Sequence, residues 1–519
     1  MTLPDTLALD PAHLHQGCDP AAFEFETTAE LPGLTELIGQ VRAMDAVRFG
    51  AGIRHDGYNV FVLGPPGLGK RSLVRQFLDA KARDEAKSDD WCYVNNFAQP
   101  HKPQALRLPS GKGEELRREM AQLVDYLRTA IPALFESEEY AAKTKTIQEE
   151  FEERQRQAFQ ALADDAKQQD IALLRTPHGF AFAPTRNNEV IPPQVYESLP
   201  EAERDHIGAA ISALQARLEK ILEQIPQWWK ERSERIKQLN RDTTQSTVQH
   251  VLDELRTRFA ELPAVQAYLD AVQQDMVEHA DDFRKQEETT QVSGLTITTR
   301  ESFHRYQVNV LVSNGTPGGA PIVSEDNPTY ANLVGRVEHI AQLGALVTDF
   351  TLIKPGALHR ANGGYLLLDA RKVLMQPFAW EALKRALQSR AIHIESLGQM
   401  VSLVSTVSLE PEPIPLEAKV ILFGERLLYY LLQQYDPEFG ELFKVAADFE
   451  DRIERSAESQ QLYARLVASL VTQEKLLPFD RGAVARVIDH SARLAGDAER
   501  LSTHMRSVIN LLQQADHWA

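Results

Sequence analysis

The stretch "FVLGPPGLGKRSL", residues 61–73, has the composition and spacing of a phosphate-binding loop. Four residues separate Gly64 from Gly69, and Lys70 follows directly. Glycines allow successive backbone N–H groups to point at phosphate oxygens, and the next helix adds its positive end. An apolar run precedes the loop and a helical pattern follows it, which is the context that such a loop requires. We therefore predict a nucleotide-binding site that includes Gly64, Pro65, Pro66, Gly67, Leu68, Gly69, Lys70, Arg71 and Ser72.

An ATPase also needs an acidic residue at the end of a neighbouring strand, which holds Mg²⁺ through water. The run "YLLLD" supplies Asp369, so we predict that Asp369 lies near the nucleotide and holds Mg²⁺ in this way. The alternative for Asp369 is a helix cap at the end of a strand. ATP or ADP, with Mg²⁺, is the expected cofactor.

Two positions depart from the pattern of an active ATPase. Arg71 stands where a Ser or Thr normally binds Mg²⁺, and Ala370 stands where a Glu normally activates water. Ser72 is a poor substitute because one helical step rotates a side chain by roughly 100°. These changes predict nucleotide binding with slow or absent hydrolysis. Glu425, just past the strand "VILFG", is a candidate base, and otherwise a solvated residue.

Charged residues near the C-terminus suggest a nucleotide sensor. Arg493, Arg500 and Arg506 lie in helical patterns there, and we select Arg506 as the arginine that senses the γ-phosphate. The segment "QQYDPEFGELFKV" lies where a ring ATPase presents a charge to its neighbour's nucleotide, and it offers Lys444.

The order of patterns along the 519 residues predicts an α/β core interrupted by a long helical insertion. We expect four parts. An N-terminal segment with the first part of the core covers 1–110, a coiled-coil-like helical arm covers 111–300, the second part of the core covers 301–455, and a helical lid covers 456–519.

The aromatic, proline-containing stretch "GFAFAPTRNNEVIPP" falls between helices of the arm, where a tip would lie. We predict that Phe180 and Phe182 contact unfolded protein there, because an unfolded chain offers apolar surface. The alternative is that both rings pack back onto the arm. Tyr330 is a further candidate for substrate contact.

Composition limits the class of protein. The net charge of −18 argues against a general nucleic-acid binder, and two cysteines make neither a disulfide framework nor a zinc site. The N-terminus lacks the pattern of a secretory signal, and no apolar run approaches the ~20 residues that span a membrane. We therefore expect a cytoplasmic protein with no membrane partner and little affinity for nucleic acid.

Together these motifs resemble a Lon-like ATP-dependent protease of the AAA+ superfamily, in the bacterial branch with a helical insertion in the ATPase domain. The resemblance covers most of the chain, and "LHRANGGYLLLDA" is its most specific stretch. That stretch is similar to the segment "HxAxxGxLxxDE" of membrane-anchored archaeal Lon, with Ala370 in place of the final Glu. The stretch "LSTHMRSVINLLQQAD" resembles the Lon helix whose arginine senses nucleotide, which points to Arg506.

The resemblance implies a hexameric ring that threads unfolded protein into a chamber, where a Ser-Lys dyad acts as a serine-type endopeptidase. No stretch resembles the segment around the Lon serine, so the chain is either the ATPase portion of a longer hydrolase, which we expect, or a natural relative without the peptidase. Two further alternatives, of other function classes, stay open. One is a DNA-repair ATPase similar to SMC and Rad50, and the other is a nucleotide-gated scaffold without hydrolysis, which Arg71 and Ala370 favour.

Overall fold

The computed structural model divides the chain into two compact units. One comprises residues 1–118 and 307–519, and the other comprises residues 119–306. The described residues are 16–34, 38–176, 179–186, 189–283, 288–292, 295–299, 303–315, 318–342, 345–395 and 409–519. Among the helices of these residues, none is both long enough and apolar enough to cross a bilayer.

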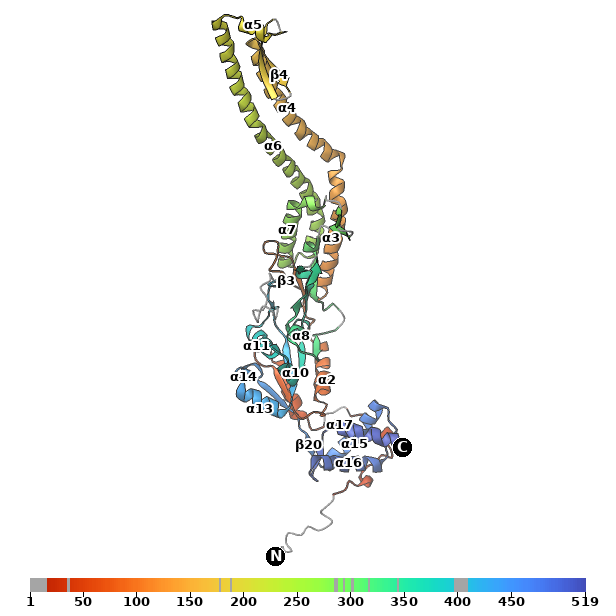
Figure 1. Ribbon diagram of the computed structural model, residues 1–519. Helices are drawn as coiled ribbons and strands as arrows, with labels where there is room; N and C mark the ends of the chain where they lie inside the picture. The colour runs from red at the N-terminus through yellow and green to blue at the C-terminus, as the bar shows by residue number, and fades with distance from the viewer. Residues whose placement is uncertain are drawn as a thin grey trace, which may run out of the picture. The chain divides into compact units, whose positions relative to one another are not determined.

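The centre of the first unit is a five-stranded sheet in which every neighbouring pair is parallel (Figure 1). Its strands are β10 (Ile322–Glu325), β15 (Tyr365–Asp369), β18 (Lys419–Gly424), β1 (Val60–Leu63) and β19 (Val445–Asp448), in that spatial order. A parallel sheet needs both faces covered, which explains why these strands read as nearly continuous apolar runs.

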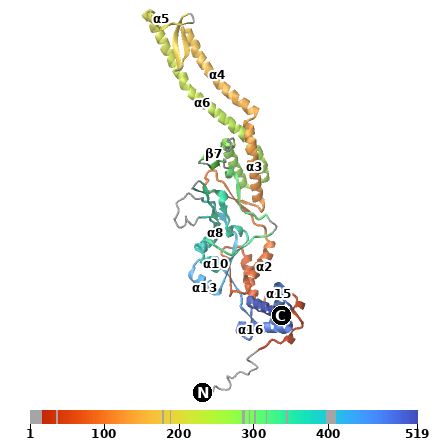
Figure 2. The same cartoon turned by 45° about the vertical axis from the view of Figure 1, so that its right-hand side comes forward.

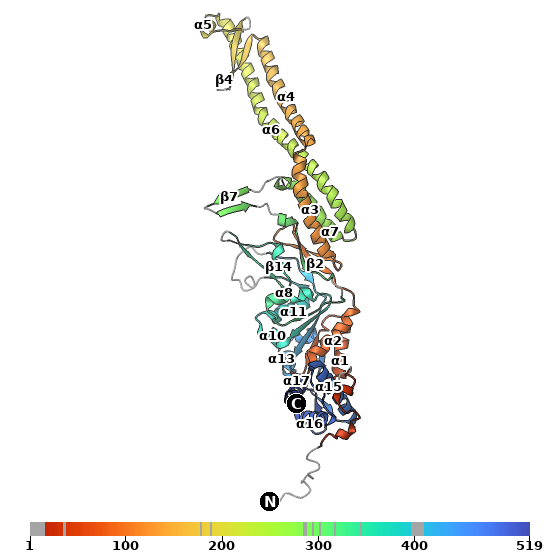
Figure 3. The same cartoon turned by 90° about the vertical axis from the view of Figure 1, so that its right-hand side faces the viewer.

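Alternate residues of β10, β15, β18 and β1 pack into two different hydrophobic cores. Val60 and Val62 of β1 pack beneath α1 (Val41–Gly52) and α2 (Lys70–Arg83), whereas Phe61 and Leu63 face the other core. That second core contains residues of α8 (Tyr330–Val334), α9 (Ala357–Arg360), α10 (Ala370–Met375), α11 (Ala379–Ser389), α13 (Arg426–Tyr435) and α14 (Phe439–Leu442). Figure 3 shows α1 and α2 on one side of the sheet and α10, α11 and α13 on the other. The predicted α/β architecture is thus confirmed, as three layers.

Smaller sheets complete the first unit. Strands β2 (Asp90–Val94), β3 (Gln104–Leu108) and β9 (Val308–Val312) form an antiparallel sheet of their own. The two-stranded pairs are β11 (Arg336–Val337) with β14 (Ile353–Lys354), β12 (Ile340–Gln342) with β13 (Ala345–Val347), β16 (Ala391–Ile392) with β17 (Ile414–Pro415), and β20 (Arg452–Glu454) with β21 (Arg500–Ser502).

The C-terminal helices share a core with the beginning of the chain. Helices α15 (Ala457–Glu474), α16 (Arg481–Ala495) and α17 (Met505–Trp518) pack around a cluster that includes Cys18, Phe23 and Phe25. Backbone hydrogen bonds reinforce this contact, since the N–H of Thr28 donates to the carbonyl of Phe479 at 2.8 Å. The described part of the N-terminal segment therefore packs with the last helices.

The second unit is mainly helical. Its long helices are α3 (Lys112–Phe135, which starts in the first unit), α4 (Glu138–Gln168), α6 (Glu201–Arg258) and α7 (Pro263–Glu278). Helices α4 and α6 run side by side (Figure 2) and bury two clusters, one around Leu162 and Leu214 and one around Phe151 and Trp228. Strands β4 (Ile171–Thr176), β5 (Gly179–Arg186) and β6 (Glu189–Val190) form a small antiparallel sheet, followed by the short helix α5 (Pro193–Glu197). Strands β7 (Glu288–Val292) and β8 (Leu295–Thr299) form a hairpin.

Candidate nucleotide-binding site

The glycine loop connects the end of β1 to the start of α2, as its spacing predicts. Gly67 and Gly69 have φ values of +88° and +71°, in the left-handed region that side chains disfavour. Leu68 is buried and anchors the loop in the core beneath α2, whereas Pro66 is exposed. Glycines adopt these angles with the least strain, which favours them in this tight turn between a buried strand and a helix start.

Lys70 is folded back on the loop itself. Its Nζ donates hydrogen bonds to the carbonyl oxygens of Gly64 and, at 3.2 Å, of Pro65. Burial lowers the pKa of Lys70, while the nearby carboxylates of Glu425 and Asp369 act in the opposite direction. A partly buried ammonium ion that is held by neutral carbonyls is well placed to exchange them for phosphate oxygens.

The order of the strands corrects one expectation about Asp369. Its strand, β15, is not the neighbour of β1, because β18 lies between them. Leu63 pairs with Gly424 of β18, so the next residue, Glu425, lies beside the start of the glycine loop. Asp369 pairs with Phe423 from the other side of β18. Both carboxylates nevertheless act on the pKa of Lys70, so the fold brings them together at one sheet edge.

Asp369 and Ala370 occupy the junction between β15 and α10. One oxygen of Asp369 accepts the backbone N–H of Lys372 at 3.0 Å, so this residue is the helix cap that the sequence offered as an alternative. Its second oxygen, Oδ2, makes no hydrogen bond or ion pair within the described residues. Ala370 is 1% exposed and belongs to the core, so its position has no room for a long side chain.

Arg71 forms an ion pair that the sequence did not predict. Its Nη2 lies 3.0 Å from Oδ1 of Asp326, which follows β10 directly. The Nζ of Lys372 donates to the carbonyl of the same aspartate at 2.9 Å. Ser72 is exposed on α2. The position that usually supplies a metal-binding hydroxyl therefore carries a cation held by a carboxylate.

Helix α17 closes on the glycine loop through its first turn. The backbone N–H of Arg506 donates to the carbonyl of Gly67 at 3.2 Å, and the Arg506 side chain is exposed. The ring of His504 lies against Gly67, where an added Cβ would come within 2.5 Å of it. His504 was not anticipated from the sequence, although its place two residues before Arg506 in the sensor-like stretch is the available signal.

The other expected sensor charges lie elsewhere. Arg500 is in β21, with its Nε 3.6 Å from Asp497, and Arg493 is exposed on α16. Lys444 precedes β19 and therefore lies at the amino end of the parallel strands, opposite the glycine loop. Its Nζ donates to the carbonyl of Asp56 at 3.1 Å and lies over the ring of Tyr58.

Three family models match separate parts of the chain. A LonB-like AAA domain matches residues 318–450, the helical domain of Lon-like LonC matches residues 90–123, and the archaeal LonB AAA+ ATPase lid domain matches residues 478–519. The chain is a Lon-like AAA+ protein.

Curated relatives of this Lon-like chain agree. A Lon protease homologue of Escherichia coli (strain K12) is 33% identical over 30% of this chain and 25% of its own length. An archaeal Lon protease of Thermoplasma volcanium is 24% identical over 40% of this chain and 31% of its own. The chain thus spans about a quarter to a third of the relatives it matches. NtrX from Brucella abortus aligns over 38% of this chain and 41% of its own at 16% identity, with a TM-score of 0.24 that carries no argument.

In "LHRANGGYLLLDA", the most specific Lon-like stretch, close contacts of two residues fix the local turn. His359 is buried, and its Nδ1 accepts the backbone N–H of Gly356 at 3.2 Å. Burial lowers the pKa of His359 to about 3, so the ring stays neutral. Gly364 passes so close to Pro321 that an added Cβ would lie 2.1 Å from its carbonyl oxygen. These residues fix the turn that starts β15 and hence the position of Asp369.

The three candidate substrate-contact residues of the Lon-like chain differ in exposure. Tyr330 is 3% exposed in the core at the start of α8, so its burial does not favour its assignment to substrate contact. Phe182 packs against the cluster around Leu162, and Phe180 stacks on Phe159 with ring centroids 4.7 Å apart. Phe180 remains 37% exposed. The two phenylalanines pack onto their own helices because β4 and β5 lie along α4 and α6.

Proposed function

We propose that this Lon-like chain binds ATP or ADP in the glycine loop. The proposal rests on the position of Lys70. Its Nζ donates to two carbonyl oxygens of the loop, and the carboxylates of Glu425 and Asp369 raise its pKa against the effect of burial. Phosphate oxygens would replace those carbonyls, and the start of α2 would add its positive end. Arg506 lies in the first turn of α17 and its backbone N–H contacts Gly67, so its exposed side chain can turn toward the γ-phosphate.

Asp369 is the residue that would hold Mg²⁺, through water and its Oδ2 oxygen. When bound, the metal would neutralise charge on the β- and γ-phosphates. Arg71 offers the metal no oxygen and adds a positive charge near it, so the metal would depend on the phosphates for direct contacts. Hydrolysis in this site would be slow, because Ala370 supplies no base and Glu425 is the nearest alternative.

We further propose that the first unit engages unfolded protein through the β12–β13 hairpin. Three of its apolar side chains are exposed, with Ile340 at 57%, Leu346 at 72% and Val347 at 45%. The hairpin is part of the chain between β10 and β15, the strands that carry Asp326 and Asp369 at their ends. Exposed apolar surface of this kind marks a protein-binding site. The sequence signal for this hairpin is weak, because "HIAQLGALV" resembles an ordinary buried hairpin.

The whole protein would act in ATP-dependent proteolysis. The relatives named Lon protease support this, and a hexameric ring with a Ser-Lys endopeptidase remains a proposal by resemblance. The helical second unit would assist in handling substrate. The Lon-like matches do not support the DNA-repair ATPase. One observation favours the alternative of a nucleotide-gated scaffold without hydrolysis, namely the ion pair of Arg71 with Asp326.

A titration with a fluorescent ATP analogue tests nucleotide binding. The wild-type chain should bind saturably, and Lys70→Ala should weaken binding by about tenfold or more, because a charge-assisted contact to phosphate is lost. Lys145→Ala is a matched control, since Lys145 belongs to the second unit and its side chain is 75% exposed. Equal affinity of Lys70→Ala and wild type would remove the phosphate-loop assignment.

A further inference from the structure

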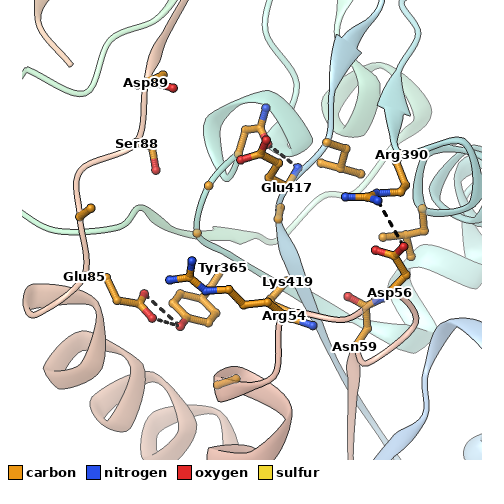
Figure 4. A pocket seen from close by; sticks show the side chains of 18 of the residues that line it. Arg54, Asp56, Asn59, Glu85, Ser88, Asp89, Tyr365, Arg390, Glu417 and Lys419 are labelled. Carbon is orange, nitrogen blue, oxygen red and sulfur yellow. Dashed lines mark hydrogen bonds and ion pairs between the residues drawn. The ribbon is translucent and has the colours of Figure 1, made fainter. Parts of the chain in front are cut away.

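A pocket of about 450 Å³ lies at the edge of the parallel sheet opposite the glycine loop. It is lined by residues that precede β1, β2, β15 and β18, whereas the glycine loop follows the carboxyl end of β1. Figure 4 shows Arg54, Ser88 and Lys419 reaching this pocket from three different segments of the first unit. The pocket is therefore separate from the candidate nucleotide site, and its volume is in the range of small-molecule sites.

The carboxylates that line the pocket already have partners. Asp56 pairs with Arg390 at 3.3 Å, and Arg107 pairs with both Asp89 and Glu417. The remaining one, Glu85, accepts the hydroxyl of Tyr365 at 2.9 Å and pairs with Lys81 at 2.8 Å. Dashed lines in Figure 4 mark the contacts of Asp56 with Arg390 and of Glu85 with Tyr365.

Three cations of the pocket lack a carboxylate partner. Arg54 and Lys87 form no ion pair within the described residues. Lys419 donates only to backbone carbonyls, those of His55 at 3.3 Å and Tyr58 at 3.2 Å, and burial lowers its pKa. The pocket lining carries five Lys or Arg cations and four carboxylates, an excess of one positive charge, in a chain whose net charge is −18.

Ser88 supplies an independent sign of a missing ligand. Its residue is 8% exposed, and its hydroxyl has no hydrogen-bond partner within the described residues. Leaving a buried hydroxyl unsatisfied is costly, so such groups usually have a partner or a bound molecule. Gly363, also in the pocket wall, leaves room at this hydroxyl, because a Cβ there would lie 2.4 Å from Oγ.

We propose that this pocket binds the phosphoryl group of a small ligand, with the Ser88 hydroxyl as donor and Arg54, Lys87 and Lys419 as countercharges. A phosphoryl group matches both features of the pocket, since its oxygens accept from a hydroxyl and its charge suits several cations at once. The site is distinct from the nucleotide loop and does not depend on it.

The test is calorimetric titration of pyrophosphate into the full chain that carries Lys70→Ala, which removes the glycine-loop lysine. Saturable binding should persist. Adding Ser88→Ala, or Arg54→Ala with Lys87→Ala, should weaken it by about tenfold or more. Adding Lys145→Ala with Lys230→Ala, two cations of the second unit that are 75% and 80% exposed, should change nothing. The melting temperature of the Ser88→Ala chain should match its parent.

Citrate separates phosphoryl recognition from general anion binding, and inorganic phosphate shows whether one phosphoryl group suffices. Weak binding of citrate is expected. The proposal is overturned if pyrophosphate does not bind the Lys70→Ala chain, if pocket and control variants bind equally, or if citrate binds as tightly as pyrophosphate. In the wild-type chain the same titration should show two classes of site, and the Ser88→Ala variant should lose one of them. The titrations of the Lys70→Ala chain are independent of whether nucleotide binds the glycine loop.

Discussion

The Nη2 atom of Arg71 lies 3.0 Å from Oδ1 of Asp326, across the tips of α2 and β10. The two residues are far apart in sequence, and the parallel pairing of β10 with β15 places this ion pair at the same sheet edge as Asp369. The arginine therefore supplies positive charge where a phosphate-binding site normally recruits a metal ion.

Nucleotide binding should depend little on Mg²⁺. We expect removal of the metal with EDTA to weaken ATP binding by less than about threefold in the wild-type chain, because Arg71 already supplies a charge. Arg71→Thr should make the affinity Mg²⁺-dependent by about tenfold, since the hydroxyl can bind the metal. Arg75→Thr, one turn further along α2, is the matched control. Loss of wild-type binding in EDTA would contradict the expectation.

Hydrolysis should be slow, because losing a positioned base typically costs ~10²- to 10⁴-fold in rate. Phosphate release at saturating ATP measures it. Any residual rate should fall further in Glu425→Gln, since Glu425 lies beside the glycine loop, and should be unchanged in Glu441→Gln, an exposed residue of α14. A brisk wild-type rate that survives Glu425→Gln would show that another group activates water.

Restoring the missing acid should not restore activity. Ala370 is 1% exposed in the core, so Ala370→Glu should cost about 1–3 kcal/mol from overpacking alone. Chemical denaturation of the variant, with Ala86→Glu at an exposed position as control, measures the loss. A variant as stable as the wild type, with faster phosphate release, would mean that the junction of β15 and α10 rearranges to accept the acid.

Binding of unfolded protein should depend on the β12–β13 hairpin. Ile340→Ser, Leu346→Ser and Val347→Ser together should weaken binding of a labelled, permanently unfolded protein while nucleotide affinity stays constant. The control replaces three exposed apolar residues elsewhere in the first unit, Val41, Leu477 and Leu494, by serine. Fluorescence anisotropy gives both affinities. Deleting residues 179–193 tests the second unit in the same assay, and a loss confined to that deletion would assign binding to the helical unit instead.

Acid should destabilise the chain through His359. Its folded pKa of about 3 lies below the ordinary value of 6.5, so the unfolded state binds one more proton between these limits. This contribution to stability is complete above pH 6.5 and is lost as the pH falls, by about 1 kcal/mol between pH 6.5 and 5.5. His359→Asn keeps an acceptor for Gly356 and removes the titration. Urea unfolding at both pH values should show a smaller acid loss in the variant, and equal losses would refute the assignment.

The sequence alone determined the parts of this protein that depend on short-range backbone geometry. The glycine spacing from Gly64 to Lys70 requires one kind of turn between a strand and a helix, and the structure has that turn. The apolar runs ending at Leu63 and Asp369 were sufficient to indicate buried strands of an α/β core, because only buried strands are apolar on both faces. The family resemblance rests on the same local stretches.

The tertiary structure decided which of these parts meet. Local spacing does not specify that β18 separates β1 from β15, that Arg71 faces Asp326, or that Tyr330 is buried. The pocket around Ser88 likewise needs four segments to converge. Such contacts depend on the spatial order of the strands in the sheet. The sequence of a single strand does not specify its neighbours, because all buried strands carry similar apolar side chains.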